Sequence, residues 1–365
     1  MGGHRNQYGY HEYRGRGGGR ARAVLLFIIA LLAVLLAVVV AFSMFVDLEY
    51  TDTGVKISWR GVEDNPSPPP IASNPVEVVS SPVGDVTVEP IESVEPTPTP
   101  VPEPQYTPIG AVSVTLEQLR GGTAAQAVAA AGGNALVVQM KDVNGRLAWQ
   151  SQVPLAANLG TNAADNGTAQ AVRTLAEAGN LYLVARVQCF RDPVLARNWV
   201  GSIMTRGGNV WHDYQGMGWS SPASRQAVDY LSALCLELAD MGFDEILLDS
   251  AGYPDTGEVK VLAVSDNRPQ DLSVPVAAFW QRLSGELAEK GVALSVQTSE
   301  EALRGENTLS GVTAANLGLY AARVWVPASV KGTDYAALLT AGGLDNTAAR
   351  VVVKNSYGPA GSWYR

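Results

Sequence analysis

The chain has 365 residues and a formal net charge of −9, so it is long enough for a (β/α)8 barrel of roughly 250 residues plus accessory segments. The acidic balance argues against a nucleic-acid partner, because phosphate binding requires a basic face. Three histidines and two cysteines exclude a histidine-rich metal centre and a disulfide framework. We expect Cys189 and Cys235 to be buried free thiols, and the alternative is that they pair outside the cell.

The N-terminus predicts a membrane anchor. Residues 1–23 are rich in glycine and carry five arginines against one glutamate, and an uninterrupted apolar run extends from Val24 to Val46. About 20 apolar residues span a bilayer as a helix, and the preceding arginines keep the N-terminus in the cytoplasm. A cleaved signal peptide is the rival interpretation, but the run is longer than a usual signal sequence. We therefore expect a single-pass membrane protein with an extracellular C-terminal domain, in contact with the lipid bilayer through Val24–Val46.

Two short segments follow the anchor. Residues 47–61 form a juxtamembrane segment, within which Asp47–Trp59 alternates around an Asp-Thr-Gly turn and predicts a hairpin. Residues 62–109 hold 13 of the 21 prolines, and this composition predicts a disordered linker that acts as a stalk.

From residue 110 to residue 365 the pattern becomes α/β. Apolar runs predict strands at 111–114, 134–140, 181–188, 244–249, 292–297, 323–326 and 350–353. Helical patterns between them cover 123–131, 169–178, 224–241 and 275–290. Continuous apolar strands that alternate with helices predict a parallel sheet covered on both faces, here a (β/α)8 TIM-type barrel. An eighth strand is not evident in the last residues, so the barrel is either incomplete or closed irregularly. No phosphate-binding glycine motif occurs, and we expect no cofactor and no metal site.

The C-terminal ends of parallel barrel strands carry the chemistry of this fold. Asp249 ends one such strand, in the stretch GFDEILLDSAGYP. Arg186 lies within another apolar strand, where a guanidinium requires a carboxylate, and Asp249 or Asp142 would supply it. Candidate substrate-binding residues at or near the strand ends are Lys141, Asp142, Asp192, Trp211, Tyr253, Gln297, Trp325 and Lys354.

Several of these residues have a purely structural alternative. Asp142 fits a cap of the following Asn-Gly turn, and Asp192 fits the N-cap of a helix that begins at Pro193. Glu300 fits the solvated start of a helix, and the tryptophans fit core packing. Nevertheless, carboxylates with aromatic side chains and a fixed arginine suit carbohydrate chemistry, because glycoside hydrolysis requires one ionised and one protonated carboxyl group.

Four blocks in order resemble the "putative glycosyl hydrolase domain" family, a TIM-barrel group of bacterial envelope proteins in the alpha-amylase-like clan. The blocks are Lys141-Asp142-Val143-Asn144-Gly145, Ala185-Arg186 leading to Phe190-Arg191-Asp192-Pro193, Trp219-Ser220-Ser221-Pro222, and Gly242 to Ile246. The resemblance covers roughly residues 110–357. It implies a barrel that faces a polysaccharide or peptidoglycan glycan.

The chain departs from the family pattern at two places. Ser250 and Gly252 replace a tyrosine and an arginine after Asp249, and Gln297 stands where the family usually has an aspartate. An amide cannot supply a proton at neutral pH. We therefore expect a glycoside-hydrolase-like protein in which Asp249 is the nucleophile or charge stabiliser, Glu300 the acid/base and Arg186 the orienting cation. The alternatives are an inactive barrel that binds glycan or an envelope protein, and a purely structural domain.

Overall fold

The computed structural model describes residues 46–51, 54–59, 106–355 and 361–365. The chain divides into two units, Met1–Pro96 and Thr97–Arg365. The predicted basic tail, and nearly all of the predicted membrane anchor and linker, lie outside the described residues. Among the helices that the structure describes, none combines the length and the apolar character needed to cross a membrane.

The first unit contains the predicted hairpin. Strands β1 (Val46–Thr51) and β2 (Gly54–Trp59) pair antiparallel, with Val46 opposite Trp59 and Thr51 opposite Gly54. The prediction of a hairpin over Asp47–Trp59 is confirmed.

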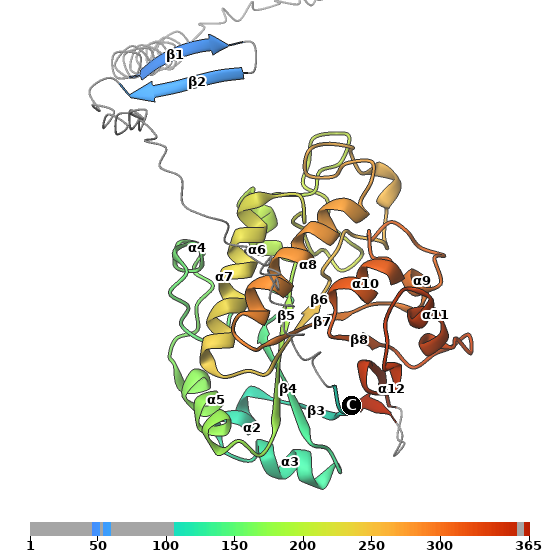
Figure 1. Cartoon of the computed structure of the whole chain (residues 1–365). Helices are drawn as coiled ribbons and strands as arrows, with labels where there is room; N and C mark the ends of the chain where they lie inside the picture. The colour runs from blue at the N-terminus through green and yellow to red at the C-terminus, as the bar shows by residue number, and fades with distance from the viewer. Residues whose placement is uncertain (1–45, 52–53, 60–105, 356–360) are drawn as a thin grey trace, which may run out of the picture. The chain divides into compact units, whose positions relative to one another are not determined.

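The second unit contains a closed barrel of eight parallel strands (Figure 1). The strands are β3 (Gly110–Val114), β4 (Ala135–Lys141), β5 (Tyr182–Gln188), β6 (Glu245–Asp249), β7 (Ala293–Gln297), β8 (Arg323–Val326), β9 (Val351–Lys354) and β10 (Ser362–Tyr364). The seven predicted strands are confirmed. The expectation of an incomplete barrel is wrong, because the three-residue β10 pairs with both β9 and β3 and closes the sheet.

Helices connect the strands and surround them (Figure 1). They are α2 (Leu116–Arg120), α3 (Ala124–Ala130), α4 (Pro154–Leu159), α5 (Gly167–Ala178), α6 (Pro193–Arg197), α7 (Arg225–Met241), α8 (Ser273–Ala288), α9 (Glu300–Leu303), α10 (Ala314–Tyr320), α11 (Tyr335–Ala341) and α12 (Thr347–Arg350), with a 3-10 turn η1 (Val259–Val261). The four predicted helices correspond to α3, α5, α7 and α8. The core between helices and strands also buries Cys189 and Cys235 as free thiols, which confirms that prediction.

Side chains inside the barrel form layers, because every second residue of a strand points inward. The middle layer is apolar and includes Val184, Leu247, Trp325, Val352 and Tyr364. Two residues earlier in their strands lie Glu245 and Arg323, at the N-terminal end of the barrel. Two residues later lie Arg186, Asp249 and Lys354, at the C-terminal end. The alternation therefore places charged groups at both ends of an apolar interior.

The N-terminal end is closed by a buried polar network. Arg323 forms an ion pair with Glu245 (Nη1–Oε2, 2.6 Å) and donates from Nη2 to the carbonyl of Thr107 (3.1 Å). The guanidinium of Arg323 also lies over the ring of Tyr106, 5.4 Å from its centroid, and Arg350 lies over the same ring at 4.9 Å. These contacts hold the segment that enters the barrel against its N-terminal end.

Two long loops extend the opposite, C-terminal end. One joins α6 to α7 and the other joins β6 to α8, and they pair with each other at Thr205 and Leu262. Arg191 and Trp219 both donate to Oδ2 of Asp213, which fixes the first loop against the barrel (2.7 and 3.3 Å). The paired loops form one wall of a pocket at this end of the barrel.

Candidate active site

Asp249 and Arg186 form the centre of the site. Asp249 is the last residue of β6, and its Oδ2 accepts hydrogen bonds from Nη2 (2.5 Å) and Nε (3.1 Å) of Arg186 on β5. Their side chains are 19% and 28% exposed, so the pair remains open to a ligand. The predicted need of Arg186 for a carboxylate is confirmed, and Asp249 supplies it.

The backbone immediately after Asp249 has an unusual conformation. Ser250 has a φ of 49°, in the left-handed region that few residues other than glycine adopt. Its hydroxyl accepts from Nε2 of Gln188 (2.6 Å) and approaches Oδ1 of Asp249 (3.4 Å). Such conformations cluster at functional sites, where the surroundings must stabilise them.

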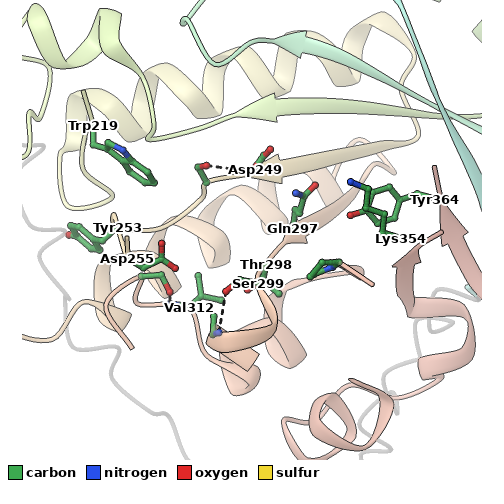
Figure 2. Close-up of a pocket in the computed structure, with 14 residues that line it drawn as sticks. Trp219, Asp249, Tyr253, Asp255, Gln297, Thr298, Ser299, Val312, Lys354 and Tyr364 are labelled. Carbon is green, nitrogen blue, oxygen red and sulfur yellow. Dashed lines mark hydrogen bonds between the residues drawn. The ribbon is translucent and has the colours of Figure 1, made fainter. Parts of the chain in front are cut away.

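A pocket of about 350 Å³ opens beside this pair. Its lining residues are Trp219, Asp249, Ser250, Tyr253, Asp255, Gln297, Thr298, Ser299, Ala302, Ser310, Val312, Pro327, Lys354 and Tyr364. Figure 2 shows Asp249 between two groups, with Trp219, Tyr253 and Asp255 on one side and Gln297, Lys354 and Tyr364 on the other. Four of the sequence-predicted residues therefore share this pocket with Trp219 and Asp255: Asp249, Tyr253, Gln297 and Lys354.

Asp255 is a second carboxylate that the sequence interpretation missed. It lines the same pocket as Asp249 but comes from the loop after β6. Burial raises the pKa of Asp255, and the negative charge of Glu301 raises it further, although a hydrogen bond from the backbone of Asp255 itself lowers it in part. The available signal was its position, directly after the Tyr253-Pro254 pair that follows the strand end.

Gln297 ends β7 and lines the pocket with an unpaired amide. Its Oε1 is buried and has no hydrogen-bond partner among the described residues. A buried polar atom without a partner is costly, so this amide is available for a ligand.

Glu300 is not in the pocket, and the expectation that it is the acid/base disagrees with its surroundings. Its side chain is 2% exposed and accepts hydrogen bonds from the hydroxyls of Ser329 (2.6 Å) and Thr333. The amides of Val330 (3.0 Å) and Lys331 (3.3 Å) donate to it as well. These bonds, chiefly those from Ser329 and then Thr333, lower the pKa of Glu300 to about 2. A general acid requires a raised pKa, so Glu300 instead organises the loop after β8.

Lys141 and Asp192 are also removed from the pocket. They form a buried ion pair with each other (Nζ–Oδ2, 2.6 Å), with side chains 0% and 1% exposed. The Oδ1 of Asp192 caps α6 by accepting from the amides of Val194 and Leu195. The structural alternative for Asp192 is therefore confirmed, and neither residue reaches a ligand in this structure.

The three remaining candidates have structural contacts. Asp142 accepts from the amides of Asn144 (2.9 Å) and Arg146 (2.8 Å), which caps the predicted turn. Trp211 is buried and donates to the carbonyl of Glu258 (3.2 Å). Trp325 fills the barrel interior and donates to Glu245 (3.0 Å). Their assignment to substrate binding is not supported, because none of them lines the pocket.

The described part of the chain contains no group of three or more His, Cys, Asp or Glu side chains arranged to hold a metal ion. The side chains that line the pocket include two carboxylates, an amide, an amine and aromatic rings.

Comparisons with solved structures give similarities of low sequence identity. A hypothetical protein from Ruminiclostridium thermocellum is 23% identical with a TM-score of 0.45, over 51% of this chain and 96% of that one. The PgaB (BpsB) glycoside hydrolase domain from Bordetella bronchiseptica is 13% identical with a TM-score of 0.49, over 71% and 94%. The exo-β-N-acetylglucosaminidase from Vibrio harveyi is 12% identical with a TM-score of 0.43, over 69% and 41%.

No curated protein matches the chain. Residues 112–308 match the protein family described as "Putative glycosyl hydrolase domain", and this range covers β4 to β7 completely together with the Arg186–Asp249 pair. The matched range is more than half of the 365 residues. The chain therefore belongs to the "Putative glycosyl hydrolase domain" family.

Proposed function

We propose that the barrel is a glycoside hydrolase whose two carboxylates are Asp249 and Asp255. One observation carries the proposal: the two groups line one pocket in opposite environments. Asp249 is ion-paired with Arg186, and both side chains are partly exposed. Burial raises the pKa of Asp255, which favours its protonated form. Pairs of titratable groups with divergent environments are the pattern that separates acid from base in hydrolases of this kind.

Each side chain then has a defined task. The carboxylate of Asp249 faces the anomeric carbon of the sugar and either bonds to that carbon as the bond to the departing sugar breaks or stabilises the positive charge that develops on it, and water then attacks the carbon to complete the hydrolysis. Arg186 is a positioning residue that fixes this carboxylate through two hydrogen bonds. Asp255 gives its proton to the oxygen of the departing sugar. Trp219 and Tyr253 are buried aromatic side chains that form the wall on this side of the pocket (Figure 2).

We also infer where the reaction takes place. The apolar run Val24–Val46 and the arginines before it support an uncleaved anchor with the barrel outside the cell. The substrate is then a polysaccharide of the cell envelope, peptidoglycan included, or of the surroundings. Protease accessibility of the barrel on intact cells tests this part separately.

A second candidate function is glycan binding without cleavage. Gln297 favours glycan binding without cleavage. It places an amide at the end of β7, where the family pattern has an aspartate, and an amide cannot donate a proton in catalysis. In this case Asp255 only hydrogen-bonds the bound sugar.

The deciding experiment is a hydrolysis screen of the full-length protein on peptidoglycan, starch-like glucans and other bacterial polysaccharides, read as released reducing ends. Asp249→Asn and Asp255→Asn should each lower the rate at least about 10²-fold, the usual scale for lost acid/base catalysis. Asp240→Asn, a change at an exposed ion pair with Lys290, is the matched control. Cleavage that survives both substitutions would refute the assignment. Binding without cleavage by the unmodified protein would favour the second candidate.

A further inference from the structure

One end of the pocket carries a positive charge that the barrel itself does not neutralise. Lys354 is the last residue of β9 and an exposed lining residue of the pocket. Within the described residues it has no ion-pair or hydrogen-bond partner, whereas the nearby cation Arg186 is matched by Asp249. The free ammonium group is therefore available to a ligand.

The strand register fixes where this charge lies. Lys354 is directly opposite Tyr364 on β10 and two residues after Val352, and both of these belong to the interior of the barrel. Residues two apart share a face of a strand, so Lys354 lies at the mouth of the interior and not on its outer surface. Tyr364 packs against Trp325 with ring centroids 5.1 Å apart, which holds this wall in place.

Polar groups beside Lys354 also lack partners. The buried Oε1 of Gln297 accepts no hydrogen bond, and the structure gives neither its amide nitrogen nor the Tyr364 hydroxyl a partner among the described residues. Figure 2 shows Gln297, Lys354 and Tyr364 grouped on the side of Asp249 away from Asp255. One ammonium, one amide N–H and one phenol O–H are donors, and the amide oxygen is an acceptor for a sugar hydroxyl.

We propose that Gln297, Lys354 and Tyr364 form a subsite for the carboxylate of an acidic sugar, so that the glycan is an acidic polysaccharide. The proposal rests on the proposed function, in that the pocket holds a glycan across Asp249. A carboxylate carries the single negative charge that one unmatched lysine balances. A phosphate monoester carries nearly two at neutral pH and would bring excess negative charge towards Asp249.

The test measures binding and not turnover, with the full-length Asp255→Asn variant, which keeps Arg186 paired with Asp249, and calorimetry or ligand-observed NMR. The probes are oligosaccharides of uronic acids (galacturonate, glucuronate and mannuronate series) and the same oligosaccharides after chemical reduction of their carboxyl groups. At least one acidic probe should bind about tenfold or more tightly than its reduced counterpart, the scale of one hydrogen-bonded charge. Lys354→Gln should remove this preference, so that the acidic probe and its reduced counterpart bind with equal affinity.

Three controls make the outcome interpretable. Lys354→Arg should retain the preference, Lys290→Gln should not alter it, and inorganic phosphate at equal concentration should not displace the acidic probe. Equal binding of acidic and reduced probes, or a preference that survives Lys354→Gln, would overturn this subsite while leaving the hydrolase proposal intact. Failure of every acidic and neutral glycan to bind would overturn both proposals.

Discussion

The buried pair Lys141–Asp192 gives the sharpest prediction. Lys141→Met replaces an amine whose Nζ lies 2.6 Å from Oδ2 of Asp192 and donates to the carbonyl of Gln188 at 2.7 Å. Methionine has nearly the same length, so little volume is lost. The substitution leaves the carboxylate of Asp192 buried without its counter-charge. Asp192 cannot turn towards water, because its Oδ1 caps α6.

The loss of one partner from a buried ion pair lowers the free energy of unfolding by about 3–5 kcal/mol, and we expect this effect for Lys141→Met. At about 2–4 °C per kcal/mol for a domain of this size, the melting temperature should fall by roughly 6–20 °C. Asp192→Asn alone should lower the free energy of unfolding by a similar amount, because it leaves Lys141 buried without a counter-charge. The double variant Lys141→Met/Asp192→Asn removes both charges and keeps the cap through the amide oxygen. It should lose only about 1–2 kcal/mol, chiefly for the donor lost to the Gln188 carbonyl.

The assay is thermal unfolding of the full-length protein followed by circular dichroism. Lys290→Met is the control, because its exposed pair with Asp240 should contribute less than about 1 kcal/mol. A Lys141→Met variant as stable as the unmodified protein would refute the reasoning, as would a double variant no more stable than the single ones. Unchanged stability with lost glycan binding would return Lys141 to the substrate-binding set.

Three further predictions concern groups at other positions. Glu300→Gln should lower the melting temperature at pH 7. The difference from the unmodified protein should shrink as the pH falls from about 4.3 to about 2, because Glu300, whose pKa is lowered, stabilises the fold only while it is ionised. A difference in melting temperature that stays constant down to pH 2 would contradict this prediction. The hydrolysis rate should fall as the pH rises through the raised pKa of Asp255, because Asp255 then loses the proton that it donates. Asp255→Asn should lower the hydrolysis rate by about 10²–10⁴-fold, and a substrate whose leaving group needs no proton should restore the rate. Tyr106→Ala should destabilise the protein by about 1–3 kcal/mol, because the ring contacts two guanidinium groups, and chemical denaturation measures this loss.

The barrel and the centre of its site could be predicted from the sequence because parallel topology determines both. Apolar runs that alternate with helices indicate parallel strands, and parallel strands end at one edge. The carboxylate of Asp249 follows such a run directly, and the cost of burying Arg186 without a counter-charge predicted a carboxylate partner, either Asp249 or Asp142. These predictions needed only the identity of residues and their places along the strands.

Lys141 shows what strand position alone cannot give. Simple alternation from Gln139 would point Lys141 into the barrel. The register between β4 and β5 shifts between these two residues, so that Lys141 lies opposite Val187, which packs in the core between strands and helices. A bulge of this kind redirects the side chain towards Asp192. No pattern in the sequence marks the bulge, so Lys141 was assigned to the substrate.

The closing strand and the second carboxylate were missed for a different reason. Three residues are too few to show a periodic pattern, and β10 is recognisable only by its partners on β9 and β3. Asp255 lies six residues beyond the end of β6, in a loop whose path depends on its pairing with the loop before α7. Both features arise from contacts between segments distant in the chain.

The two ends of the barrel carry the same kind of ion pair and use it differently. Glu245 and Asp249 lie four residues apart on β6, and each meets an arginine from another strand. At the N-terminal end Tyr106 and Thr107 cover the Glu245–Arg323 pair, whose side chains are at most 3% exposed. This pair is closed to a ligand and holds residues 106 and 107 against the barrel. At the C-terminal end the Arg186 and Asp249 side chains remain 28% and 19% exposed beside the pocket. Residues 106 and 107 therefore contact the covered end of the barrel, and the pocket lies at the opposite end.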